Sequence, residues 1–204
     1  MIDIGIGIGI DKARQAWEAV EQIPYGRHIT ETKEELLEVI EGPLRPALGA
    51  FFDRNVETIV SSCNYSDYAQ GKANVALGHD SLSEDNKEIV EGYAPHEFFD
   101  MPGGYTMVGM FFPIGERDTP AVIGERALNL AESFSVQHTL WSGGWNLDQE
   151  RELQGGHGGR IPSHEEVSDE QLTQLLIAQG RYYDPTTGLF FMNRIHHQRA
   201  TQSI

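Results

Sequence analysis

The sequence predicts an α+β domain, a two-layer sandwich in which helices cover one face of a mostly antiparallel sheet of four or five strands. Three features support this fold class: an amphipathic helical region at 32–54, strand-like runs that follow one another without an intervening helix, and a C-terminal helix followed by a hairpin. Consecutive strands without a crossover helix favour antiparallel pairing over a doubly wound sheet. We expect an α+β core domain over 1–141, a glycine-rich loop over 142–163, and a helix-plus-hairpin extension over 164–204 that packs on the core.

The region 32–54 carries the strongest helical signals. Thr32 and Glu35 have the spacing of a capping box, in which each side chain bonds a backbone N–H at the start of the helix. Apolar residues then recur every four positions and form one buried stripe: Leu36, Ile40, Leu44 and Leu48. Gly42-Pro43 interrupts this run, so we expect one helix to end there and a second to follow.

Period-two patterns predict the strands. Ile alternates with Gly over residues 1–10, and this pattern indicates an edge strand. Further strand patterns follow at 56–61, 73–77, 105–112 and 136–141. Between them we expect helices at 11–23 and 119–134, and irregular loops at 65–71 and 93–104. We also expect a short helix that a capping box of Ser81 with Glu84 opens and that ends at Gly92.

The C-terminal region has its own helix and turn signals. Ser168 with Gln171 predicts a helix start, and Gly180 predicts its end. The run Arg181-Tyr182-Tyr183-Asp184-Pro185, with Gly188 and Phe190, resembles the YD-repeat hairpins of Rhs-type proteins. The likeness is confined to this hairpin and departs at Leu189, where that family has arginine. It implies a β-hairpin here, which the turn residues also predict.

The composition narrows the classes of function. The net charge is −16, from 15 basic and 31 acidic side chains, so the sequence predicts no nucleic-acid partner. This charge provides solubility, or it forms an acidic face for a basic partner, as in an immunity-type inhibitor. No apolar run is long enough to cross a bilayer, which predicts no membrane partner. A single cysteine indicates a cytoplasmic protein, and Gly5, Gly7 and Ile10 lack the spacing of a dinucleotide fingerprint, so we expect no cofactor.

Two strand ends carry the candidate site residues. Cys63 ends one predicted strand, between Ser62 and Asn64, and His79-Asp80 ends the next. Ligands in proteins with α/β sheets often bind beyond strand ends. The leading hypothesis is therefore a non-catalytic binding or adaptor domain, with a small-ligand or peptide pocket formed by Ser62, Cys63, Asn64, His79 and Asp80.

The same residues allow an enzyme hypothesis. Cys63 with His79, and Asp80 as a further catalytic candidate, would make a thiol- or metal-assisted hydrolase. This requires the two strand ends to meet, whereas antiparallel pairing would place them at opposite ends. No histidine pair has a metal-binding spacing, so we predict no metal site. If the protein does bind a metal ion, His79, His96 and His157 are the candidate ligands. The sequence leaves the ligand, the protein partner and the oligomeric state open.

Overall fold

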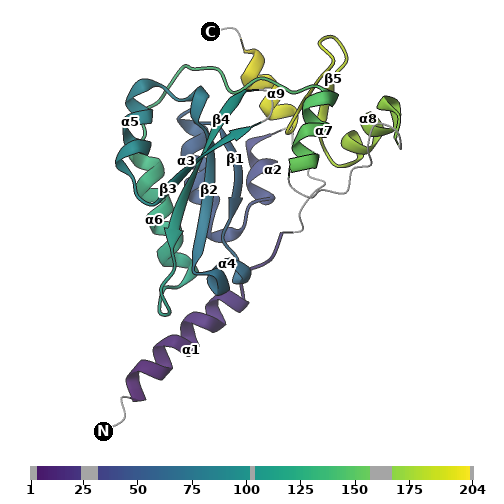
Figure 1. The fold of residues 1–204 in the computed structure, drawn as a ribbon. Helices are drawn as coiled ribbons and strands as arrows, with labels where there is room; N and C mark the ends of the chain where they lie inside the picture. Colours follow the sequence, from purple (N-terminus) through teal and green to yellow (C-terminus); the bar gives the residue numbers. More distant parts are fainter. Residues whose placement is uncertain (1–3, 24–31, 102–103, 157–166, 203–204) are drawn as a thin grey trace.

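A computed structural model of the chain describes residues 4–23, 32–101, 104–156 and 167–202. Its centre is a four-stranded antiparallel sheet in the order β1-β2-β4-β3, which Figure 1 shows as the middle of the molecule. The strands are β1 (Thr58–Ser62), β2 (Lys72–Gly78), β3 (His96–Met101) and β4 (Tyr105–Pro113). A separate two-stranded hairpin follows near the C-terminus. The α+β class and the antiparallel sheet are confirmed.

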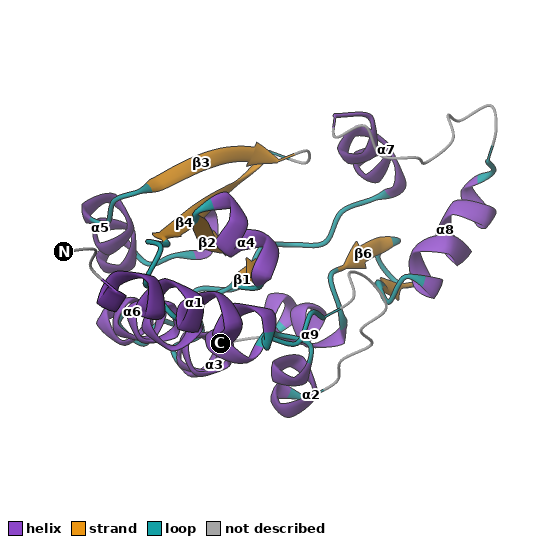
Figure 2. Ribbon diagram, turned by 90° about the horizontal axis from the view of Figure 1, so that it is seen from below, coloured by secondary structure: helices purple, strands orange, loops and turns teal. Residues whose placement is uncertain are grey.

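Helices α3 (Arg45–Asp53) and α6 (Pro120–Ser133) pack against one face of the sheet, as Figure 2 shows. The core lies between these helices and the inward side chains of the central strands. Fully buried members come from both layers: Phe51 and Ile123 from the helices, Val75, Leu77, Val108 and Met110 from the strands. Burial of apolar surface at this interface is the main source of stability, at about 1.5–3 kcal/mol for each large side chain.

The helical region before the sheet forms as its signals predict. Helix α2 (Lys33–Glu38) begins with the capping box: Glu35 N donates to Thr32 Oγ1 and Thr32 N donates to Glu35 Oε2, each over 3.2 Å. The 3₁₀ turn η1 (Gly42–Leu44) follows and leads directly into α3. Its Pro43 lacks an N–H and so separates the two helices.

The N-terminal prediction of an edge strand at 1–10 is wrong for the described residues. Helix α1 (Ile4–Glu18) projects from the body (Figure 1). The end nearest the body is anchored by Ala13 and Trp17, which are buried, and by Trp17 Nε1, which donates to the carbonyl of Asp118 over 2.8 Å. A helix satisfies its own backbone groups, whereas a strand needs a neighbour, so the period-two pattern did not decide the structure.

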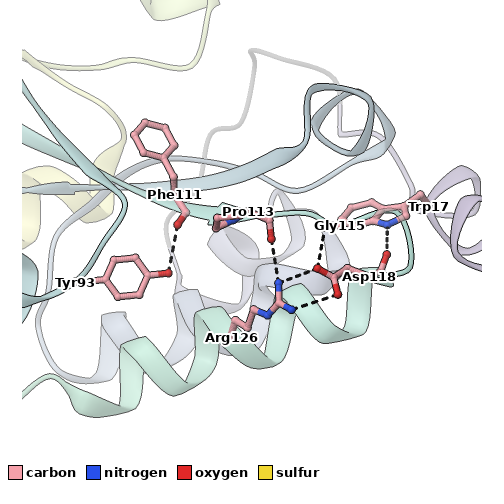
Figure 3. Close-up of polar contacts among 7 residues, drawn as sticks. All are labelled: Trp17, Tyr93, Phe111, Pro113, Gly115, Asp118 and Arg126. Carbon is pink, nitrogen blue, oxygen red and sulfur yellow. Dashed lines mark hydrogen bonds and ion pairs between the residues drawn. The ribbon is translucent and has the colours of Figure 1, made fainter. Parts of the chain in front are cut away.

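The loop 114–119 between β4 and α6, which contains Asp118, contacts both of these elements and also α1 (Figure 3). Asp118 Oδ2 accepts hydrogen bonds from Gly115 N over 3.0 Å and from Arg126 Nη1 over 2.9 Å, and Arg126 Nη2 reaches Asp118 Oδ1 over 3.2 Å. Arg126 Nη1 also donates to the Pro113 carbonyl at the end of β4. These bonds fix the direction in which the chain leaves the sheet and enters α6.

Three local predictions are corrected. Residues 65–71 form helix α4 (Tyr65–Gln70), because Asn64 and Asp67 make a capping box and Gly71 closes the helix with φ 76°. Residues 96–101 within the expected loop pair with β4 as the edge strand β3. Helix α5 (Glu84–Gly92) begins after Ser83, so Ser81 and Glu84 do not form the expected capping box.

The C-terminal elements lie on the side of the molecule away from α5 (Figures 1 and 2). They are α7 (Leu147–Gly156), α8 (Asp169–Ala178), β5 (Tyr182–Asp184), β6 (Leu189–Phe191) and α9 (Arg194–Thr201). The Ser168–Gln171 capping box and the hairpin are confirmed. The expected loop 142–163 contains α7, and residues 136–141 pair with no strand in the described chain. Within the described ranges no helix is long and apolar enough to span a membrane.

Candidate functional site

The thiol of Cys63 lies in the hydrophobic core. The residue has no exposed surface and belongs to the main core cluster. Burial, together with the nearby charges of Asp67 and Glu41, raises the pKa of the thiol to about 12. A thiolate, which is the nucleophilic form, is therefore scarce near neutral pH, and the structure gives no support to a thiol-dependent hydrolase at this position.

Ser62 and Asn64 hold the start of α4. Ser62 Oγ donates to Asp67 Oδ2 over 2.6 Å, and Asn64 N donates to the same oxygen over 2.8 Å. The Asn64 side chain accepts from Ser66 N and donates to Glu41 Oε1. Their polar groups are thus engaged in a helix cap beside the buried thiol.

His79 and Asp80 lie at the other end of the β1–β2 pair. The register sets Ser62 opposite Asn74 and Thr58 opposite Leu77, so Cys63 and His79 are separated by the length of β2, roughly 20 Å at ~3.4 Å per residue. Asp80 Oδ2 accepts from Thr106 N over 2.6 Å. The structure does not bring the five proposed pocket residues together.

Two of the candidate histidines for a metal site, His79 and His96, lie against the same aromatic ring. His79 and His96 each make an edge-to-face contact with Phe98, with ring centroids 5.1 and 5.3 Å apart. His96 Nδ1 contacts the Tyr93 carbonyl. His157 lies outside the described residues. Among the residues that the structure describes, no group of three or more His, Cys, Asp or Glu side chains could hold a metal ion.

A buried ion pair joins the C-terminal helix to the start of β1. His196 Nε2 lies 2.6 Å from Glu57 Oε1, and the side chains are 7% and 0% exposed. Ser142 donates to Glu57 Oε2 from both its N and its Oγ, each over 2.8 Å. Burial alone would raise the pKa of Glu57, but the contacts with His196 and Ser142 outweigh it and hold that pKa below its ordinary value. Glu57 is thus a buried carboxylate whose partners are the His196 imidazole and the Ser142 hydroxyl and N–H.

A second long-range contact places Arg199 of α9 beside Asn55. Asn55 has φ 56°, a conformation that is uncommon for a residue other than glycine, and its Oδ1 accepts from Arg199 Nη1 over 3.0 Å. The guanidinium lies 4.4 Å from the ring centroid of Phe52 and 5.8 Å from that of Trp141. Burial lowers the pKa of Arg199, while the charge of Asp53 opposes this shift.

The segment 135–141 runs past Asn55 with alternating inward and outward residues. Gln137 and Trp141 are 4% and 5% exposed, whereas Val136 and Leu140 are 67% and 43% exposed. The buried Gln137 amide is bonded on both sides: Nε2 donates to the Asn55 and Ser81 carbonyls, and Oε1 accepts from Ser83 N and Asn86 Nδ2. These bonds hold the segment against the body.

Backbone hydrogen bonds to the body come from the odd-numbered residues of this segment. Ser135 bonds Asn86 through both its N–H and its C=O, Gln137 N donates to the Arg54 carbonyl, and the Thr139 carbonyl accepts from Asn55 Nδ2. Within the described chain, the backbone groups of Val136, His138 and Leu140 make no hydrogen bond. Although the segment is not a strand, these three residues therefore keep backbone donors and acceptors that no described part of the chain uses.

A surface pocket of about 310 Å³ lies beside this edge. Its lining combines the outward residues with the Arg199 region: Asp53, Asn55, Val136, Gln137, His138, Leu140, Arg199 and Gln202. Sequence reasoning predicted a strand at 136–141, which the structure does not form, and it did not identify Asn55 or Arg199. No local pattern marks them, because they are brought together across 144 positions of the chain.

The chain was compared with family models, curated proteins and solved structures. No family model, curated protein or solved structure matches this chain.

Proposed function

We propose that the protein is a non-catalytic binding domain, an adaptor that takes an extended segment of a partner protein along residues 135–141, which we call the docking edge. The observation that supports this proposal is that the backbone groups of Val136, His138 and Leu140 make no hydrogen bond within the described chain. An extended peptide that adds to such an edge gains main-chain hydrogen bonds, and side-chain pockets select its sequence. The single cysteine, buried and reduced, fits an adaptor that works in the cytoplasm.

The surroundings of the docking edge define the chemistry of the peptide. Val136 and Leu140 expose apolar surface, so the partner segment presents apolar side chains at alternating positions. Arg199, in the adjacent pocket, bonds an amide oxygen of Asn55, and the nearby Asp53 is itself paired with Lys33. A carboxylate on the partner would add a charge-assisted bond to this guanidinium.

The test uses an array of acetylated seven-residue peptides in which Val or Leu alternates with Asp, Ser or Lys. We expect the Asp series to bind best and the amide signals of residues 135–141 to move on titration. His138→Pro deletes one N–H that has no partner in the described chain but keeps an extended backbone, because a residue before proline favours the β region. This variant should weaken binding by on the order of tenfold, the effect of a lost interfacial hydrogen bond.

His138→Ala is the matched control. It removes the exposed imidazole but retains the backbone donor, so its affinity should stay near that of the unmodified protein. Equal affinity of the proline and alanine variants, with both folded by circular dichroism, would refute docking through the main chain. If none of the peptide series binds saturably, the proposed adaptor function is refuted.

A further inference from the structure

A second pocket lies in the C-terminal hairpin, apart from the docking edge. Its volume is about 350 Å³, which is in the range of small-molecule sites. The lining residues are Ile177, Gly180, Arg181, Tyr182, Tyr183, Pro185 and Arg194. Two of these described lining residues are arginines and none is acidic, although the chain as a whole carries 31 acidic and 15 basic side chains.

Arg181, which lines this pocket, has unused hydrogen-bonding capacity. It forms no ion pair within the described residues, and its buried Nε has no hydrogen-bond partner there. Nη1 contacts the Met192 sulfur at 3.1 Å, which is a weak acceptor, and the guanidinium lies 5.7 Å from the Trp145 ring centroid. Buried guanidinium groups in proteins are normally paired with an oxyanion, because an unsatisfied buried donor is costly.

The walls of the pocket are held in place by ring contacts. Tyr183 packs on Phe190 with centroids 4.9 Å apart, and Tyr182 packs on His197 at 4.7 Å. The adjacent carboxylate of Asp184 is occupied: it accepts from Thr186 N and Thr187 Oγ1, and it lies 3.4 Å from His197 Nε2. It is therefore engaged elsewhere and does not act as the missing partner of Arg181.

We propose that this pocket binds a small organic oxyanion, a carboxylate or a phosphate ester with an aromatic or aliphatic body. The two terminal nitrogens of the Arg181 guanidinium pair with the oxyanion in two-point fashion. Arg194 also lines the pocket, and the tyrosines contact the apolar body of the ligand. The site uses no residue of the docking edge, so it stands independently of the proposed adaptor function.

Calorimetric titration at fixed ionic strength tests the proposal with four probes: inorganic phosphate, phenyl phosphate, benzoate and benzylammonium. We expect saturable binding of at least one organic anion, weaker binding of inorganic phosphate, and none of benzylammonium. Preference between benzoate and phenyl phosphate identifies the oxyanion. Failure of all three anions to saturate the unmodified protein would overturn the proposal without any variant.

Substitutions locate the binding. Arg181→Met should weaken anion binding by on the order of tenfold or more, since a charge-assisted two-point contact is lost. Arg181→Lys, which keeps the charge but not the fork, should be intermediate. The control is Arg117→Met, an exposed arginine outside the pocket, which should bind as the unmodified protein does. Unchanged anion affinity in both Arg181 variants would show that the anion binds elsewhere and would refute the proposal. Peptide binding at the docking edge should be the same in the Arg181 variants as in the unmodified protein.

Discussion

Replacement of His196 by alanine probes the contact on which the packing of α9 depends. The substitution leaves the Glu57 carboxylate buried, with Ser142 as its remaining hydrogen-bond partner. Removal of one member of a buried ion pair costs about 3–5 kcal/mol. Because Ser142 still satisfies one oxygen, we expect a loss near the lower limit of that range, about 3 kcal/mol in the free energy of unfolding at pH 7.

The pH dependence gives this prediction a second readout. The folded-state pKa of Glu57 lies below its ordinary value of 4.5, so the stabilisation by this carboxylate is complete above that pH. It is lost as the pH falls through the folded-state pKa. In His196→Ala the contact with the imidazole no longer opposes the effect of burial, so the pKa of Glu57 rises. Its carboxyl group is then protonated at a higher pH than in the unmodified protein. The difference in stability between the two proteins should therefore narrow as the pH falls from the raised pKa in the variant through the lowered pKa in the unmodified protein.

Urea unfolding followed by circular dichroism, at several values between pH 7 and pH 4, measures both effects. His138→Ala, which removes an exposed imidazole, is the control and should stay within about 0.5 kcal/mol of the unmodified protein. A loss for His196→Ala no larger than that of the control would show that Glu57 does not depend on this partner. A loss of full size that is independent of pH would show that packing, and not charge, is responsible.

Three further predictions concern the rest of the fold. Cys63, whose pKa burial raises to about 12, should not react with a disulfide reagent at pH 8 in the native protein and should react fully in urea. Gly124→Ala should lower stability by about 2 kcal/mol, seen in thermal unfolding, because the new methyl group would overlap the Pro43 carbonyl. Asp118→Asn should cost about 1 kcal/mol at pH 7, since Arg126 is partly exposed. The Asp118 difference should vanish in acid, as the pH falls below the lowered folded-state pKa of Asp118 and that carboxylate is protonated.

The sequence identified elements whose signals are short-range. Thr32 with Glu35, and Ser168 with Gln171, mark helix starts because the bonds that they make span three residues. The same rule would have found α4, whose cap is Asn64 with Asp67. The Ile–Gly alternation at the N-terminus indicated a strand, but periodicity cannot supply the neighbouring strand that such a pattern needs.

What the sequence by itself determined is the layered α+β class, because helix caps, proline breaks and alternating apolar residues act locally and are written in adjacent positions. Only the tertiary structure decided which groups share a site. The antiparallel register of β1 and β2 moved Cys63 and His79 to opposite ends, and the packing of α9 brought His196 to Glu57 and Arg199 to Asn55. Such contacts depend on how distant segments pack together, and no local pattern of residues encodes that arrangement.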